Sequence, residues 1–250
     1  MANIRPDHDA GDWASGHDVV AHVFVATLGD ACTVSGDDGH HLARVRRLRV
    51  GERITAADDS GRWRPYEIEA VSGAELDLIA VGGVRTEPRG EPGLAVAFAL
   101  TKGEKPERVV TQLTEIGVDR ILPVVAHRSV VRWDDGRRAA AGARFRRVAR
   151  EAAMQSHRAR LPVIGDVVAL ASLVGHPAVL IAEAGASGPP TTSPSGGEWL
   201  VVVGPEGGLE PDEAAALGPV GRFAVGPHVL RAETAAVAAA SALALTRRLG

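Results

Sequence analysis

The chain has 250 residues, a net charge of -3, 45% hydrophobic and 24% charged residues. This length can bury a sizeable core in one large domain or two modest ones, and the composition is ordinary for a soluble globular protein. The charge excludes a globally basic nucleic-acid-binding protein, so any contact with nucleic acid must come from a local patch.

Cys32 is the only cysteine, which excludes an internal disulfide or a Cys-rich metal site and fits a reducing cytoplasm. No stretch reaches the roughly 18 apolar residues of a membrane span, and the longest apolar run, residues 235–245, predicts a buried helix. Residues 1–18 are acidic and lack an apolar signal core, so we expect a disordered leader there.

Residues 19–82 are predicted to form a small β-barrel, because short, partly alternating runs are separated by Gly, Asp and Ser. The expected strands are residues 23–25, 53–56, 66–71 and 75–79. One short helix is expected over residues 38–48. Residues 83–93 are polar and rich in Gly and Pro, which is typical of a linker between domains.

Residues 94–250 alternate between apolar strands and helices, which predicts an α/β domain with a mostly parallel sheet and helices on both faces. The expected strands are residues 94–100, 121–125, 178–182, 199–203 and 223–225. The expected helices are residues 106–116, 138–156, 211–217 and 233–249; Pro106 begins the first and Gly117 ends it.

Three glycine-containing loops follow strands of this sheet, at residues 182–185, 204–208 and 226–235. Ligands of open parallel sheets bind at the carboxyl ends of the strands, and Gly allows a ligand or another backbone to approach closely. The loop at Gly204 lacks the spacing of a P-loop and of GxGxxG, and Glu206 would repel a pyrophosphate. Taken alone, the Gly204 loop is best explained as a strand-to-helix turn. The presence of the Gly226 loop after a later strand favours a ligand site instead.

The two loops together resemble a known family. VGPEGG at residues 203–208, followed by VGPHVLRAETA at 225–235, is similar to the RsmE family, the 16S rRNA (uracil(1498)-N(3))-methyltransferases of the SPOUT class. Further matching motifs run along nearly the whole chain after residue 20: GHHL at 39–42, VRRL at 45–48, TEIGV at 114–118, RSVV at 128–131 and EAAMQS at 151–156.

The resemblance implies a PUA-like, RNA-binding barrel followed by a trefoil-knotted domain that binds S-adenosylmethionine (SAM). It also implies a homodimer, because the knot of SPOUT enzymes packs against its twin. The implied SAM-binding residues are Glu183, Val203, Gly204, Pro205, Glu206, Gly207, Val225, Gly226, Leu230, Glu233, Thr234 and Ala235. No metal is expected, since His40 and His41 have no further ligands at metal spacing and are better explained as turn or core residues.

The implied reaction is methylation of uracil N3, which must lose a proton and then needs a cation near the uracil oxygens. Arg231 is the candidate cation, with a structural ion pair to Glu233 or Glu206 as an equally weighted alternative. Glu206 could act as the base or hold Arg231, and the sequence does not separate these roles.

RNA contacts are expected from local basic and polar residues. For any single Arg, the simpler alternative is a solvated surface side chain that does not contact RNA. The candidates are His22, Arg44, Arg46, Arg47, Lys102, Arg128, Gln155 and Arg158, with Arg49, Arg132 and Arg160 nearby in sequence. Such phosphate contacts give affinity and register but do not select a sequence. The expected partner is 16S rRNA or the small ribosomal subunit.

The chain departs from the family pattern at three positions. His228 stands where the family usually has Arg, Ala232 where it has Thr, and His22 where it often has Arg. These departures concern single RNA contacts more than the fold. Two other functions remain open: another SPOUT enzyme, such as a ribose 2′-O-methyltransferase, and a non-catalytic RNA-binding protein, which should show no SAM binding.

Overall fold

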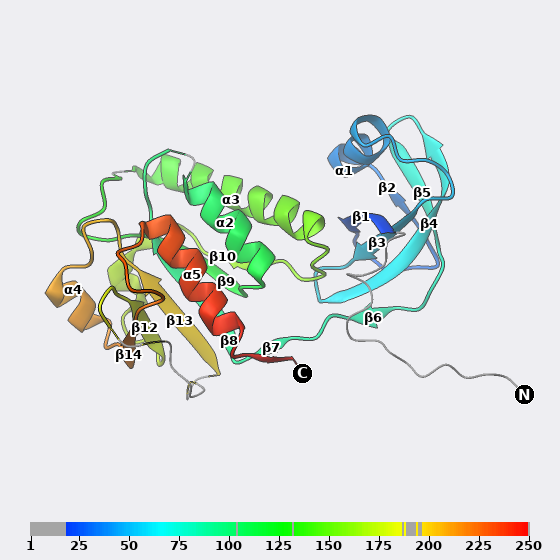
Figure 1. Ribbon diagram of the computed structural model, residues 1–250. Helices are drawn as coiled ribbons and strands as arrows, with labels where there is room; N and C mark the ends of the chain where they lie inside the picture. The colour runs from blue at the N-terminus through cyan, green and yellow to red at the C-terminus, as the bar shows by residue number, and fades with distance from the viewer. Residues whose placement is uncertain are drawn as a thin grey trace, which may run out of the picture. The chain divides into compact units, whose positions relative to one another are not determined.

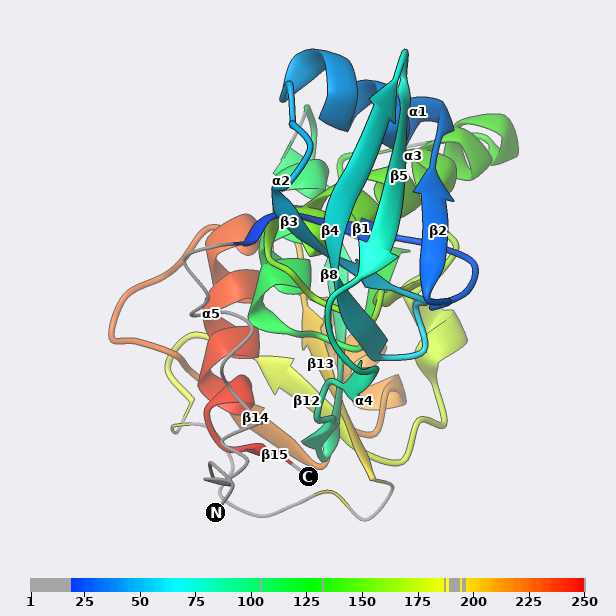
Figure 2. The same ribbon diagram turned by 90° about the vertical axis from the view of Figure 1, so that its right-hand side faces the viewer.

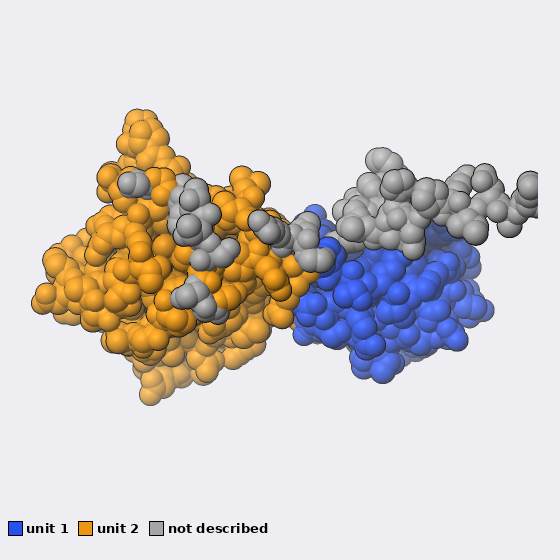
Figure 3. All heavy atoms as spheres, turned by 90° about the horizontal axis from the view of Figure 1, so that it is seen from below, with its two compact units in different colours: residues 1–88, 153–160 blue, residues 89–152, 161–250 orange. Residues whose placement is uncertain are grey.

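The computed structural model describes residues 19–103, 105–131, 133–186, 188, 194 and 197–249. The expected leader, residues 1–18, lies outside the described residues. The chain divides into two compact units, coloured blue and orange in Figure 3. The first unit contains the chain up to Pro88 together with residues 153–160, and the second contains residues 89–152 and 161–250. The short segment 153–160 thus packs with the N-terminal part, whereas the sequence interpretation placed it in the C-terminal domain.

A six-stranded, mostly antiparallel sheet forms the first unit. Its strands are β1 (Val19–Phe24), β2 (Ala31–Val34), β3 (Arg53–Ala57), β4 (Arg62–Ser72), β5 (Glu75–Ala80) and β6 (Arg85–Thr86). The order is β1-β3-β4-β5-β2, with β6 paired to β4, and only β1 and β3 run parallel. Figure 2 shows β4, β5 and β2 side by side. Alternate residues such as Ile54, Tyr66 and Leu78 point into one core, which explains the alternating pattern.

The expected helix over residues 38–48 is shorter in the structure. α1 (Gly36–His40) continues into a π-helical turn, η1 (His41–Val45), and the chain then leaves the helix at Arg47, whose φ is 57°. Leu42 anchors the turn in the core. A Cβ on Gly39 would collide with the carbonyl oxygens of Ala74 and Val34, so only glycine permits this close packing.

The second unit is built on a parallel sheet, as the sequence predicts. Its strands are β8 (Gly93–Ala99), β9 (Arg120–Val125), β10 (Val163–Ile164), β11 (Val168–Ala169), β12 (Val179–Ala182), β13 (Glu198–Val203) and β14 (Gly221–Phe223). The order is β10-β9-β8-β13-β12-β14, with β11 also paired to β9. All these pairs are parallel, which brings the carboxyl ends of the strands to one edge.

Helices cover both faces of this sheet (Figure 1). The helices α2 (Lys105–Ile116), α3 (Asp135–Gln155) and α5 (Ala232–Ala244) pack on the face that carries Val96 and Phe98. The short helices α4 (Pro211–Ala216) and η2 (Leu170–Leu173) pack on the face that carries Ala95 and Ala97. Both faces of β8 are therefore buried, which explains its continuous apolar run. No helix within the described residues is long and apolar enough to cross a membrane.

The last helix was expected to reach residue 249, and this is wrong, because α5 ends at Ala244. Arg248 and Leu249 instead form β15, which pairs antiparallel with β7 (Gly90–Glu91) in the expected linker. Arg247 accounts for the change of course. Its guanidinium donates hydrogen bonds to the carbonyl oxygens of Gly90, Pro92 and Gly117 and to the carboxylate of Asp119. These partners lie more than a hundred positions away in sequence, so no helical pattern could reveal them.

Candidate functional site

A cavity of about 460 Å³ opens where β12, β13 and β14 end. Its walls are the loops that follow these three strands, together with the first turn of α5. This volume lies in the range of small-molecule sites, and most of the wall is apolar or backbone, which is typical of such sites. The strand order therefore gathers the three glycine-containing loops of the sequence around one cavity.

Most of the predicted SAM-binding residues line this cavity. They are Glu183, Val203, Gly204, Pro205, Glu206, Val225, Gly226, Leu230 and Ala235. Gly207, Glu233 and Thr234 are not among the lining residues, and neither is Arg231. Sequence reasoning missed Ile181, Leu209, Arg222 and Phe223, which also line the wall. Their only signal is their position beside the loops, at strand ends or one residue after a glycine pair.

Gly204 and Gly208 are glycines for different reasons. A Cβ on Gly204 would lie 3.1 Å from the side-chain atoms Cγ and Cδ2 of Leu209, tighter than ordinary contact. Gly204 is not in the left-handed region, so its requirement comes from this close approach. Gly208 has a φ of 71° and closes the turn by donating from its backbone N–H to the Pro205 carbonyl at 2.8 Å.

Three ion pairs join charged residues in or beside the cavity wall. Arg222 and Glu183, both in the wall, are joined at 2.6 Å between Nη1 and Oε2. Lys105, at the start of α2, contacts two carboxylates: its Nζ lies 3.0 Å from Oε1 of Glu233 and 4.0 Å from Oε1 of Glu206. The sequence interpretation gave Lys105 no role.

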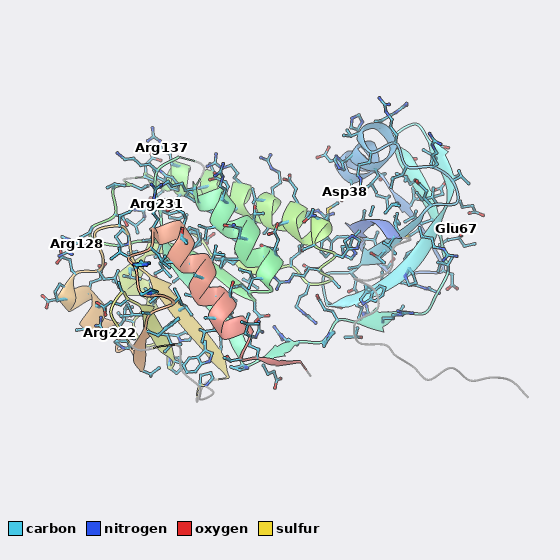
Figure 4. The ribbon with its side chains drawn as sticks, in the orientation of Figure 1. Asp38, Glu67, Arg128, Arg137, Arg222 and Arg231 are labelled. Carbon is cyan, nitrogen blue, oxygen red and sulfur yellow. The ribbon has the colours of Figure 1, made fainter. Side chains whose placement is uncertain are left out.

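Arg231 is exposed and stands at the N-cap of α5 (Figure 4). Its guanidinium forms no ion pair or hydrogen bond with the described residues. The ion pair to Glu233 or Glu206 that the sequence left open for Arg231 is made by Lys105 instead. Burial opposes the ionisation of Glu233. Its own backbone N–H, Lys105 and the charge of Arg231 more than offset this, and together they lower the pKa of Glu233 below its ordinary value.

Arg128 lies in a tight turn directly after β9. The turn is closed by two hydrogen bonds, from the Ala126 N–H to the Ser129 hydroxyl and from the Ser129 N–H to the Ala126 carbonyl, both 3.0 Å. The Arg128 guanidinium donates two hydrogen bonds of 2.9 Å to the Glu210 carboxylate and one of 2.7 Å to the Gly207 carbonyl. These bonds to Glu210 raise the pKa of Arg128, and Arg128 in turn lowers the pKa of Glu210.

The other predicted RNA-binding residues fall into an exposed group and a buried group. Arg44, Arg47, Lys102 and Gln155 are exposed. Arg46 is also exposed, but its Nη2 donates to the Val20 carbonyl at 2.6 Å. Arg132 lies outside the described residues.

Two of the candidates are buried. His22 is 3% exposed and shares a 2.7 Å hydrogen bond with Thr55. Arg158 is 7% exposed, and its charge acts on Glu87, as does that of Arg160. Burial leaves His22 and Arg158 little surface for an RNA contact. The described residues contain no group of three or more His, Cys, Asp or Glu side chains that could hold a metal ion.

Comparisons with known proteins match both units. The RNA methyltransferase domain family matches residues 89–244, and the RNA methyltransferase PUA domain family matches residues 34–80. The ribosomal RNA small subunit methyltransferase E of Mycobacterium bovis is 37% identical over 242 residues, covering 88% of this chain and 89% of that protein. The protein of the same name from Bacillus subtilis is 28% identical over 232 residues, covering 87% and 91%.

Solved structures give the same picture. A putative methyltransferase from Legionella pneumophila, in complex with the bound cofactor SAM, is 26% identical with a TM-score of 0.79, covering 91% of this chain and 98% of that one. The ribosomal RNA small subunit methyltransferase E from Neisseria gonorrhoeae, at 23% identity, has a TM-score of 0.77 and covers 89% and 96%. The second likeness shows the shared fold.

Proposed function

This chain belongs to the RNA methyltransferase family, with the ribosomal RNA small subunit methyltransferases E as relatives, and from that premise we propose what it does. It methylates 16S ribosomal RNA with SAM as the methyl donor, and its target is N3 of one uridine, of the position-1498 type. The observation that carries the proposal is the cavity at the ends of β12, β13 and β14, lined by the two loops whose motifs resemble the RsmE family.

The residues at the cavity fit SAM. Val203, Leu209, Val225 and Leu230 offer apolar surface for an adenine ring, and the loop backbones offer N–H and C=O groups for its edge. The backbone of Gly204 lies so close to Leu209 that a Cβ would press on that side chain. Because glycine has no Cβ, the adjoining space in the cavity stays open. SAM supplies a methyl group activated on a sulfonium. The protein therefore mainly positions the uracil and removes the proton from its N3.

Two charged residues beside the cavity serve the uracil. N3 must lose its proton, and the negative charge then spreads to the ring oxygens. Arg231 has no ion-pair partner among the described residues and is exposed, so its guanidinium is free to stabilise that charge. Glu206 lines the cavity and accepts the proton, and its carboxylate lies 4.0 Å from the Lys105 ammonium.

Three finer features belong to the same proposal. A trefoil knot in the second unit is supported by the strand order β13-β12-β14, in which the chain crosses from β13 past β12 to β14 before α5 returns over β8 and β13. A homodimer is supported by the family resemblance. A cytoplasmic location is supported by the single cysteine and by the ribosomal substrate.

RNA binding is assigned to the exposed residues of both units, with the arginines of η1 and of the turn that follows it as the main phosphate contacts. Arg44 and Arg47 are exposed there, and the PUA domain match covers them. Lys102 and Gln155 are exposed candidates near the ends of β8 and α3. The partner is 16S rRNA, either free or within the small subunit.

The test compares ribosomal RNA nucleosides from cells with and without the gene by mass spectrometry, beside a SAM titration of the purified protein. We expect one 3-methyluridine to be absent without the gene and to return when an active copy is supplied. Loss of a 2′-O-methylated nucleoside instead would identify a ribose methyltransferase. Failure of the protein to bind SAM would identify a non-catalytic RNA-binding protein.

A further inference from the structure

We propose that Arg128 is a positioning residue for the SAM site, which latches the loop that forms one wall of the cavity, and that it is not primarily an RNA contact. The inference rests on the proposed function, because it concerns the same cavity. It reassigns a residue whose exposure and position after a strand suggested a phosphate contact. It also gives a function to Glu210, which the sequence motifs do not single out.

The latch joins two loops at the carboxyl edge of the sheet. Arg128 follows β9, while Gly207 and Glu210 belong to the loop that follows β13, about eighty positions later. The same loop supplies Gly204, Pro205, Glu206, Gly208 and Leu209 to the cavity wall. One guanidinium therefore fixes the loop at two points, the Gly207 carbonyl within the glycine turn and the Glu210 carboxylate just after it.

The arginine is itself held in place. The Ala126–Ser129 hydrogen bonds close its turn, and the Ser129 side chain is buried. The neighbouring His127 N–H donates to Glu213 of α4 at 3.0 Å, which docks the same turn on the helix that follows the loop. A planar guanidinium can make all three bonds to Glu210 and Gly207 at once, whereas a lysine ammonium cannot reproduce the bidentate geometry.

The energetic argument is one of preorganisation. A loop with two glycines in succession has many conformations, and ordering it on ligand binding would cost free energy. The latch orders the loop beforehand, so its loss should weaken SAM binding although Arg128 does not line the cavity. The Arg128 guanidinium is paired with Glu210. Replacing Glu210 with Ala, which releases the guanidinium, should therefore leave RNA binding unchanged or make it stronger.

The experiment measures SAM affinity by calorimetry for Arg128→Ala, Arg128→Lys, Glu210→Ala and the double variant Arg128→Ala/Glu210→Ala. We expect each single variant to bind SAM roughly three- to tenfold more weakly, with Lys no better than Ala, and the double variant to be no weaker than the singles. The matched control is Arg146→Ala, which removes another exposed arginine that pairs with an acid, Asp166, at 3.0 Å. This control should bind SAM as the wild type does.

Two further measurements separate positioning from other roles. Hydrogen exchange in residues 204–210 should speed up in Arg128→Ala and Glu210→Ala while the midpoint of thermal unfolding stays within a few degrees of the wild type. RNA affinity at several salt concentrations should keep its slope in Glu210→Ala. Unchanged SAM affinity and unchanged exchange in Arg128→Ala, with a flatter RNA salt dependence, would overturn the latch and restore the phosphate contact. If the wild type binds no SAM, the proposed function fails as well. If the wild type binds SAM and the Arg128 and Glu210 variants bind it equally well, only the latch fails.

Discussion

At the scale of single residues, the site depends on close approach and on charge. Gly204 is bounded by Leu209, Arg231 at the N-cap of α5 has no ion-pair partner among the described residues, and Lys105 lies between Glu206 and Glu233. Only the first of these is enforced by sterics, because a side chain there would need Leu209 to move. We expect that the charges can be altered without loss of the fold, because these side chains are partly or fully exposed, and this makes them accessible to kinetic tests.

Gly204→Val should abolish SAM binding while the protein stays folded. The added Cβ would start 3.1 Å from two atoms of Leu209, and the branched side chain would push that residue or itself into the cavity. Calorimetry with SAM and circular dichroism test this together. The matched control is Gly83→Val, since a Cβ there meets no atom within 4 Å. Unchanged SAM affinity in Gly204→Val would contradict the assignment of the loop to the cofactor.

Arg231→Gln should lower kcat by roughly a hundred- to a thousandfold and leave SAM affinity nearly unchanged, because the cation acts on charge that develops only during reaction. Arg231→Lys should recover part of the rate. Single-turnover methylation of a ribosomal RNA fragment measures the effect. As a control, Arg137→Gln removes another exposed arginine, which pairs with Asp134 at 3.9 Å, and should leave the rate unchanged. A full rate in Arg231→Gln would exclude a catalytic role.

At the scale of elements, we expect two short segments to have functions that their length does not suggest. The segment formed by η1 and the two residues after it presents Arg44, Arg46 and Arg47, and the segment after α5 carries Arg247 to Asp119. The arginines of the first are exposed and the ion pair of the second is largely buried, so one should affect RNA binding and the other stability.

Replacing Arg44, Arg46 and Arg47 with Gln should weaken RNA binding and flatten its salt dependence, by about 0.7 to 0.9 in slope for each phosphate that is no longer neutralised. Arg46 also donates to Val20, so Arg44→Gln/Arg47→Gln tests the exposed pair while keeping that hydrogen bond. RNA affinity is measured at several salt concentrations beside a SAM titration. The control is Arg53→Gln on β3, which removes an exposed arginine that pairs with Glu67 of β4. An unchanged slope would show that the arginines are ordinary surface residues, and a weakened SAM affinity would contradict the division of labour between the units.

Arg247→Ala should destabilise the second unit by about 3 to 5 kcal/mol, since it leaves the Asp119 carboxylate buried without its cation. The side chains of Arg247 and Asp119 are only 7% and 11% exposed, so solvent screens the pair poorly. Urea unfolding measures the change. The exposed pair of Arg146 and Asp166 provides the comparison, because Arg146→Ala should cost at most about 0.5 kcal/mol. Equal losses of stability in both variants would disprove the role of Arg247.

At the scale of the whole molecule, we expect a homodimer. Beyond the family resemblance, α5 keeps apolar residues that its own unit does not bury: Val237, Ala238 and Ala242 are half-buried, and Leu245 just after the helix is 89% exposed. Sedimentation velocity at micromolar concentration should show a dimer for the wild type and a monomer for Val237→Glu. Ala143→Glu, at an exposed position of α3, is the control and should leave the dimer intact. A monomeric wild type would refute the prediction.

The sequence by itself determined the parallel sheet and the position of the cavity. The buried strands of the second unit are marked by continuous apolar runs, and glycine marks the loops that follow them, because both signals arise from neighbouring residues. The family resemblance rested on the same loops, and the comparisons confirm it. The short strands β2, β10 and β11 were missed, since two to four residues carry no periodic signal.

Only the tertiary structure decided which side chains meet. Arg128 and Glu210 are separated by 82 positions, Arg247 and Asp119 by 128, and Lys105 reaches Glu206 and Glu233 across a comparable stretch of sequence. The packing of residues 153–160 with the first unit is of the same kind. Such contacts depend on the order of strands in the sheet, and a strand's own residues specify that it is buried but not which strand lies beside it.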